Sequence, residues 1–234
     1  QWIREVAPEM EAKVRVPDPV TEGRNMFDHW VFDAPEELSY SAWVADETIR
    51  FIDSNPDRPW FAIAGLYLPH TPCNPTQQWF DLYKDADIPA PLLQDGELDD
   101  KPAIFSEMAA LYADGDEAEW EEFRRYYYAS CSMIDHHCGR VIEHLRETGR
   151  LDNTLVVFYS DHGEMAGDHR LMGKHHTNYE SVIHVPAIVR HPATVPAGSQ
   201  VEAVIEAVDL TQFNTLSAEA VREEISDIVS EIIG

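Results

Sequence analysis

The chain has 234 residues, of which 44% are hydrophobic, and carries a formal net charge of −26. Its length and apolar content suffice for one large domain with a buried core. The acidic balance, with a sequence pI near 4.5, excludes nucleic acid as a general partner, because phosphate binding needs clustered Lys and Arg. An acidic, lysine-poor surface also fits a salt-rich habitat, in which case stability should rise with salt; an ordinary acidic protein is the alternative.

The sequence shows no apolar stretch near the roughly 20 residues of a membrane span, and no signal peptide is visible. It begins with Gln1 rather than methionine, so we interpret the chain as a fragment or a processed product. Cys73, Cys131 and Cys138 form neither a disulfide framework nor a zinc pattern, and we expect the last two in the core. These features favour a cytoplasmic location and leave the oligomeric state open.

The first predicted elements follow a loop-rich surface segment at residues 1–34. Residues 36–54 have apolar side chains at helical spacing, and the segment Asn-Pro-Asp-Arg-Pro at 55–59 ends that helix. Residues 60–68 are a continuous apolar run, typical of a strand that is buried on both faces of a parallel sheet. Residues 77–119 are rich in Pro, Asp and Gly, and they are expected to cover the surface with short helical pieces.

The second half of the chain contains the longest predicted helix, at residues 120–150, followed by a buried strand at 154–159. A third short strand is predicted at 185–189, and a further strand is compatible with 201–208. Residues 217–233 have the pattern of an amphipathic helix. We therefore predict an α/β fold with a mostly parallel central sheet flanked by helices, incomplete at the N-terminus. It divides into a domain at 1–210 and a helical tail at 211–234.

Polar residues crowd around a glycine directly after the strand at 154–159, in the run Ser-Asp-His-Gly-Glu. Ligands of open α/β sheets bind beyond the carboxyl ends of the strands, where Asp161 and His162 lie. An adjacent carboxylate and imidazole can bind one cation, since oxygen suits Ca²⁺ or Mg²⁺ and imidazole favours Mn²⁺ or Zn²⁺. A simple helix N-cap at Asp161 is the alternative. The polar segment that follows favours a functional loop; it contains His169, Lys174, His175 and His176.

The expected roles of three other histidines depend on their places in the predicted elements. His70 follows the strand at 60–68, so it shares one sheet edge with Asp161 if that strand is parallel to the strand at 154–159. A structural loop histidine is the alternative for His70. His136 and His137 are neighbours on the long helix and should point in different directions, so we interpret them as surface or packing residues rather than as a metal pair.

Several motifs, in their order along the chain, resemble the sulfatase family of the alkaline phosphatase superfamily. The quoted runs are Leu68-Pro69-His70, Tyr126-Tyr127-Tyr128-Ala129-Ser130, Gly139-Arg140-Val141, Ser160-Asp161-His162-Gly163-Glu164, Gly167-Asp168-His169, Gly173-Lys174-His175, Tyr179-Glu180-Ser181, Val185-Pro186 and Val208-Asp209-Leu210. The resemblance covers residues 25 to about 210. Each motif alone is a weak signal, but taken jointly they are a strong one. The histidine after the metal-binding aspartate resembles the iduronate-sulfatase and phosphonate-monoester-hydrolase branches.

The resemblance implies a large central sheet, a metal bound by Asp161 and His162, and contacts from His70 and Lys174 to the sulfate or phosphate group. It implies a divalent metal, with Ca²⁺ the first choice and Mn²⁺ or Zn²⁺ as alternatives. It further implies hydrolysis of a small anionic sulfate ester. The cation and Lys174 would stabilise charge that develops on the oxygens, and His70 would donate a proton to the leaving alkoxide or a hydrogen bond to a sulfate oxygen.

The chain departs from the family at the nucleophile, which lies in Cys-x-Pro-x-Arg with the cysteine converted to formylglycine. The run at residues 73–77 places Gln77 where arginine belongs and follows the substrate histidine, so we interpret Cys73 as a bystander. The leading hypothesis is thus a sulfatase-like hydrolase that is poorly active alone. The alternatives are a phosphonate monoester or phosphodiester hydrolase, and a non-catalytic binding module on the same fold.

Overall fold

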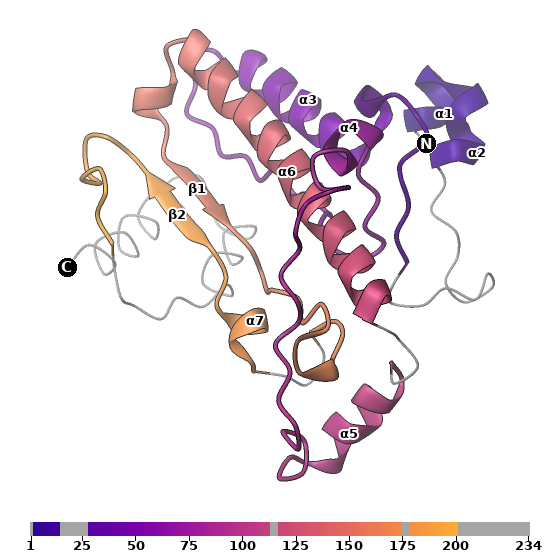
Figure 1. Ribbon diagram of the computed structural model, residues 1–234. Helices are drawn as coiled ribbons and strands as arrows, with labels where there is room; N and C mark the ends of the chain where they lie inside the picture. The colour runs from indigo at the N-terminus through magenta and orange to yellow at the C-terminus, as the bar shows by residue number, and fades with distance from the viewer. Residues whose placement is uncertain (1, 15–27, 113–116, 175–177, 201–234) are drawn as a thin grey trace.

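A computed structural model describes residues 2–14, 28–112, 117–174 and 178–200 of the chain. A long helix, α6 (Glu117–Glu147), runs through the middle of the molecule, and the other elements lie along it (Figure 1). The amino-terminal segment, expected to be irregular, instead forms α1 (Trp2–Val6), a 3₁₀ turn η1 (Pro8–Met10) and α2 (Glu11–Val14). The expected strand at 201–208, the helix at 217–233 and the division at 210 lie outside the described residues.

The helix predicted at residues 36–54 is split into a 3₁₀ turn, η2 (Glu36–Leu38), and α3 (Tyr40–Asp53). Ser39 separates them in an extended conformation, and its side chain accepts a hydrogen bond from the Ala42 amide at 3.1 Å. A serine that caps the amide groups of the first turn marks a helix start, so it divides the predicted helix. Helix α3 then packs against the carboxyl-terminal half of α6 (Figure 1).

The long helix was predicted correctly, with its ends displaced by three residues to Glu117 and Glu147. Its fully covered residues include Phe123, Ser130 and His137, which recur at seven-residue spacing. The next elements are the short η3 (Leu151–Asn153) and the strand β1 (Val156–Tyr159). The segment at 77–119 is irregular as expected, with α4 (Gln77–Phe80) and α5 (Ala103–Ala110) as its helical pieces.

The sheet within the described residues has two strands, β1 and β2 (Ala187–Arg190), and they are antiparallel. Val156 pairs with Arg190 and Tyr159 pairs with Ala187. The expected mostly parallel sheet is therefore not present in this part of the chain. Parallel neighbours need a long crossover, usually through a helix. Between β1 and β2 the described residues form the short η4 (Asp168–Arg170) and α7 (Glu180–Ile183), and the chain then turns back.

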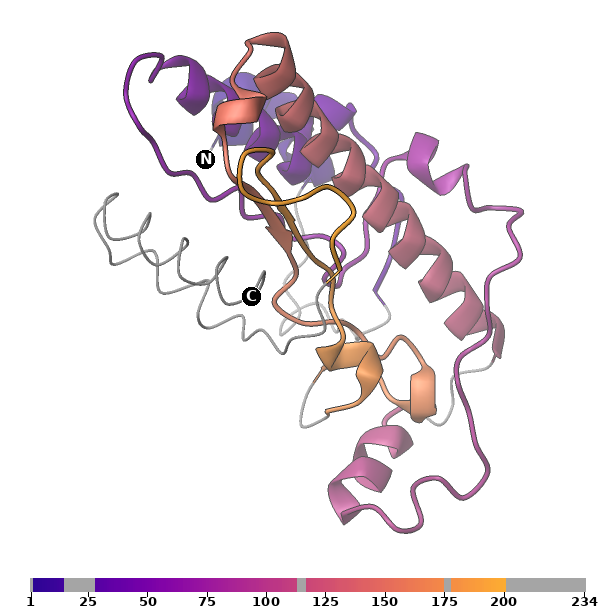
Figure 2. The same ribbon diagram turned by 90° about the vertical axis from the view of Figure 1, so that its left-hand side faces the viewer.

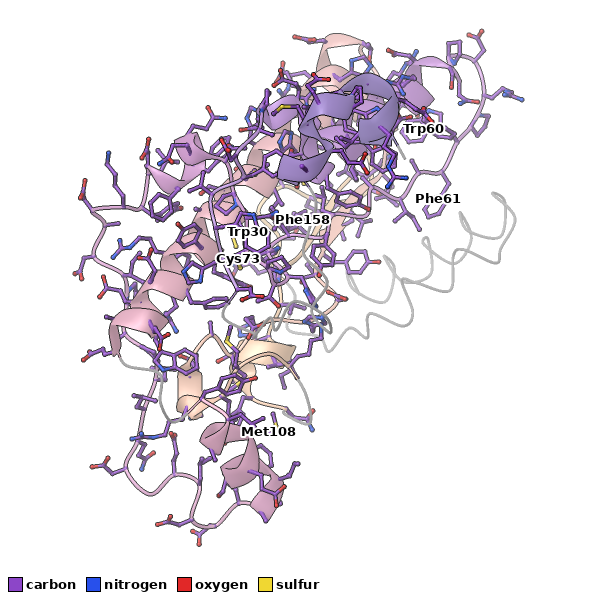
Figure 3. The ribbon with its side chains drawn as sticks, turned by 90° about the vertical axis from the view of Figure 1, so that its right-hand side faces the viewer. Trp30, Trp60, Phe61, Cys73, Met108 and Phe158 are labelled. Carbon is purple, nitrogen blue, oxygen red and sulfur yellow. The ribbon has the colours of Figure 1, made fainter. Side chains whose placement is uncertain are left out.

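Residues 60–68, predicted as a buried strand, are extended but pair with no strand among the described residues. Phe61, Ile63 and Tyr67 are exposed rather than buried. A strand is defined by hydrogen bonds to a neighbouring strand. An apolar run that has no such neighbour therefore remains irregular and exposed. Figure 3 shows Trp60 and Phe61 of this run near one end of the molecule, and Met108 of α5 near the other.

Three small hydrophobic clusters hold these elements together. The first joins α6 to the loop before α7, and the second joins α3 to the end of α6 and to η3. The third packs α5 against α7, at the lower end of the molecule in Figures 1 and 2. Their buried members are, in that order, Cys73, Trp120, Phe123, Ala166 and Met172; Ile52, Leu145 and Leu151; and Met165, Leu171 and Val182. Within the described ranges, no helix is both long and apolar enough to cross a membrane.

Candidate functional site

The turn after β1 carries the predicted metal ligands. The Asp161 carboxylate is 75% exposed, accepts a hydrogen bond from the His162 amide at 3.0 Å, and has its other oxygen 3.5 Å from His162 Nε2. His162 Nδ1 lies 2.8 Å from the carbonyl oxygen of Gly163. A carbonyl can only accept, so Nδ1 carries the proton and Nε2 of the neutral ring presents its lone pair beside the carboxylate. This arrangement is compatible with both atoms binding one cation, and that role stays a prediction.

Gly163 is required by the close approach of the segment before β2. Its amide donates to the Val182 carbonyl at 2.7 Å, and the next amide, of Glu164, donates to Ser181 at 3.0 Å. A Cβ atom at position 163 would lie 2.0 Å from the Ser181 carbonyl oxygen. The glycine therefore lets α7 hold the Asp161–His162 turn in place.

The loop that leads to Lys174 is closed by hydrogen bonds to the half-buried Glu164 side chain and to the backbone. Glu164 Oε1 accepts from the amides of Ala166 and Gly173, and the Met165 amide donates to the Gly173 carbonyl at 3.1 Å, which closes the loop. Lys174 follows immediately after this closure. His175 and His176, expected on the same rim, lie outside the described residues.

Asp168 fastens the loop to the rest of the protein. Its Oδ1 accepts from Arg124 Nη1 of α6 at 3.1 Å and from the Leu92 amide at 2.9 Å, and its Oδ2 accepts from Ser181 Oγ at 2.8 Å. Arg124 also donates to the Ala166 carbonyl at 3.0 Å. The side chains of Arg124 and Asp168 are only 13% and 12% exposed, so this is a largely desolvated pair. Sequence reasoning missed the role of Arg124, because only the packing of the loop on α6 reveals it.

His169, expected on the functional rim, is occupied in a structural contact. Its Nδ1 donates to Glu97 Oε2 at 2.7 Å, and its ring stacks on Tyr179 with the centroids 4.2 Å apart. It holds a left-handed backbone conformation, with φ of 57°. His169 thus links the loop to the irregular segment that precedes α5.

His70 lies on the turn after the extended segment and is exposed. Its Nδ1 donates to the Thr71 carbonyl at 2.7 Å and its ring lies 4.9 Å from that of Tyr67, which leaves Nε2 as the available nitrogen. No hydrogen bond or ion pair joins His70 to Asp161 or His162 in the described part of the chain. Their meeting at one sheet edge stays a prediction.

The two segments nevertheless share a core. Cys73, three residues after His70, is fully buried in the same cluster as Ala166 and Met172 of the loop after Asp161. Its thiol donates to the Pro69 carbonyl at 3.3 Å, and its backbone carbonyl accepts from Trp30, which Figure 3 shows beside it. Burial, together with the nearby Glu164 carboxylate, raises the pKa of the Cys73 thiol well above its usual value. A thiol held neutral is no nucleophile, which agrees with the interpretation of Cys73 as a bystander.

A second polar group contains His136 and His137, which the sequence does not predict to bind a metal. Glu36 of η2 meets His136 and His137 of α6, with one ligand atom from each within 4.8 Å of the others. Among the described residues this is the group of three side chains that satisfies the spacing of a metal site. The sequence gives no sign of it, because Glu36 is a hundred residues from the histidines. His137 is a packing residue and His136 is a surface residue, as predicted. The expectation that the two point in different directions is wrong, because one nitrogen of each lies within 4.8 Å of the other.

Comparison with known proteins gives a consistent result. The family profile described as "Sulfatase" matches residues 16–214. An arylsulfatase of Clostridium perfringens is 32% identical over 177 residues, which is 75% of this chain and 37% of that protein. A multifunctional alkaline phosphatase superfamily protein, PehA of Trinickia caryophylli, is 31% identical over 72% of this chain and 35% of its own length. The chain thus spans about a third of the length of these curated relatives.

Solved structures of similar fold include two phosphonate monoester hydrolases. The enzyme from Silicibacter pomeroyi is 31% identical, with a TM-score of 0.69 over 85% of this chain and 41% of its own. The enzyme from Agrobacterium radiobacter is 25% identical, with a TM-score of 0.75 over 89% of this chain and 44% of its own. This chain therefore corresponds to less than half of each of those structures.

Proposed function

The chain belongs to the sulfatase family of the alkaline phosphatase superfamily, and from that premise we propose that it carries one part of a metal-dependent ester-hydrolase site. Asp161 and His162 bind the divalent cation, and Lys174 and His70 contact the anionic group of the substrate. The substrate is a small sulfate ester. The cation is Ca²⁺, with Mn²⁺ and Zn²⁺ as alternatives.

The observation that carries this proposal is the geometry of the turn after β1. Asp161 Oδ2 and His162 Nε2 lie 3.5 Å apart, and the Gly163 carbonyl fixes the histidine tautomer that can bind a metal. A capping role for Asp161 alone would not require that tautomer. The exposed carboxylate also favours a ligand role, because it leaves room for further oxygen ligands such as water and substrate.

The proposed chemistry follows from the side chains. A bound cation would stabilise negative charge on the oxygens of the reacting group. Lys174 places a positive charge directly after the closed loop, where it can donate hydrogen bonds to the same group. His70 holds its Nδ1 proton toward the Thr71 carbonyl, so Nε2 is the atom that would exchange a proton with the leaving oxygen.

Phosphonate monoester or phosphodiester hydrolysis is the second candidate, and a specific observation favours it. Both phosphonate monoester hydrolases above superpose on more than four fifths of this chain. Sulfate and phosphonate esters present similar tetrahedral oxyanions, so the residues of the described site do not separate them. Turnover of 4-nitrophenyl sulfate against a phenylphosphonate ester makes that distinction.

The sequence contains no Cys-x-Pro-x-Arg run. We therefore expect the chain alone to bind a cation but to turn over substrate poorly. A non-catalytic binding module would have no need to preserve a paired carboxylate and imidazole. Failure to bind any cation, even with sulfate present, would favour that third alternative.

Calcium titration by calorimetry tests the proposal. We expect D161N to weaken Ca²⁺ binding at least about tenfold, because it removes the charged oxygen ligand. D57N, which removes another exposed carboxylate, from the turn after α3, is the matched control and should leave binding unchanged. Equal binding by the unaltered chain and D161N would refute the assignment, and rapid aryl-sulfate turnover by the unaltered chain would refute the incomplete site.

A further inference from the structure

The group formed by Glu36, His136 and His137 lies where η2 meets α6, away from the turn after β1. His137 Nε2 is 3.2 Å from Glu36 Oε1. The His136 ring lies 5.1 Å, centroid to centroid, from His137 in an edge-on arrangement and 5.1 Å from Trp79 of α4 in a tilted one. Three elements that are remote in sequence therefore converge on one small group of possible ligand atoms.

His137 Nε2 is buried and has no hydrogen-bond partner. Its side chain is only 2% exposed, and although Glu36 is near, the contact lacks the geometry of a hydrogen bond. Buried polar atoms are nearly always satisfied, so an orphaned ring nitrogen beside a carboxylate points to a ligand between them.

Hydrogen bonds hold one carboxylate oxygen of Glu36 in place and leave the other oxygen available as a ligand. Its Oε2 accepts from Thr76 Oγ1 at 2.7 Å, from Trp79 Nε1 at 2.8 Å and from Gln78. Burial alone would raise the pKa of Glu36, but the hydrogen bonds from Thr76, Gln78 and Trp79 lower it below its usual value. The carboxylate is therefore ionised, with Oε1 left to face the histidines.

His137 is held neutral, which is the form that binds metals. Removal from water is the largest cause that lowers the pKa of His137, and the Arg140 charge acts in the same direction, whereas Glu36 opposes them. Arg140 Nη1 lies 3.2 Å from His137 Nδ1. Because a guanidinium can only donate, Nδ1 accepts and the proton of the free protein resides on Nε2.

We propose that Glu36, His136 and His137 bind a Zn²⁺-class cation that joins η2 to α6, with water completing the coordination. Two imidazole nitrogens and one carboxylate oxygen suit zinc, whereas Ca²⁺ prefers oxygen ligands throughout. When the cation binds Nε2, the single proton of the neutral His137 ring moves from Nε2 to Nδ1. Arg140 opposes this step, because its guanidinium donor would then face the N–H group at Nδ1 of His137. The hydrogen bond from Arg140 to Asp46 is retained. The site is structural, and it stands independently of the proposed hydrolase function.

The test is Zn²⁺ titration of the full chain by calorimetry, with Co²⁺ absorption spectra to report the ligand geometry. We expect H136A to weaken Zn²⁺ binding at least about tenfold and to leave Ca²⁺ binding unchanged. Since His136 is exposed, this variant should fold, as checked by circular dichroism. H184A removes another exposed histidine, which directly follows α7, and this variant should bind Zn²⁺ like the unaltered chain.

Two further variants make the result decisive. R140Q should bind Zn²⁺ several-fold more tightly, because a glutamine oxygen can accept from the Nδ1 proton that the metal-bound ring carries. D161N should leave Zn²⁺ binding at this group unchanged. The proposal is overturned if H136A binds like the unaltered chain, if R140Q binds more weakly, or if D161N rather than H136A abolishes the Zn²⁺ signal.

Discussion

Replacing Arg124 with methionine tests whether the buried pair with Asp168 holds the loop that leads to Lys174. Methionine keeps much of the side-chain volume but removes both hydrogen bonds of Nη1, to Asp168 Oδ1 at 3.1 Å and to the Ala166 carbonyl at 3.0 Å. Asp168 would keep its donors Leu92 and Ser181 but lose its only described positive partner.

The expected cost can be estimated from these contacts. Leaving the buried Ala166 carbonyl unpaired costs about 1 kcal/mol, and leaving a mostly desolvated carboxylate without its counter-charge costs about 2 kcal/mol more, given its two remaining donors. We therefore expect R124M to lower the free energy of unfolding by about 3 kcal/mol. The additional variant R124M/D168N should recover part of this loss, because it removes the uncompensated charge.

Urea unfolding followed by far-ultraviolet circular dichroism measures this quantity. R146M is the matched control on the same helix, because Arg146 pairs with Glu143 on the surface, with side chains 57% and 52% exposed, and such pairs contribute less than about 1 kcal/mol. A loss below about 1 kcal/mol for R124M, or no recovery in R124M/D168N, would refute the view that this pair secures the loop.

Two further predictions address the turn and the core. G163A should cost more than about 2 kcal/mol in stability and should abolish Ca²⁺ binding, because its Cβ would lie 2.0 Å from the Ser181 carbonyl; a variant as stable as the unaltered chain in urea would contradict this. Burial raises the pKa of Cys131 from 9.0 to about 12, so the folded state holds this proton more tightly than the unfolded chain does. That stability is fully present below pH 9.0 and is lost as pH rises toward about 12, by roughly 2 kcal/mol at pH 10.5. Urea midpoints at pH 8 and 10.5 measure the loss, and C131A should show a smaller drop than the unaltered chain.

The sequence alone predicted elements whose signal is local. The apolar repeat of α6 and the strand β1 are each encoded by consecutive residues, and both are present within three residues of their expected ends. The Ser-Asp-His-Gly turn was also placed correctly after β1. The family assignment, made from motifs in their order along the chain, is confirmed by the match to residues 16–214.

Sequence reasoning failed where an element depends on a distant neighbour. An apolar run such as residues 60–68 becomes a strand only if another strand pairs with it, and none does so in the described part of the chain. The split of the helix at Ser39 was in principle readable, since serine is a strong N-cap, but helical spacing outweighed that signal.

The sequence by itself determined the family, the long helix and the order of the site motifs, because each rests on residues close together in the chain. Only the tertiary structure decided which oxygen Glu36 turns toward His137, that Arg124 neutralises Asp168, and that β1 pairs with β2 in opposite directions. These are contacts between segments far apart in sequence. Their geometry follows from packing the whole chain, in which many local patterns compete for the same buried space.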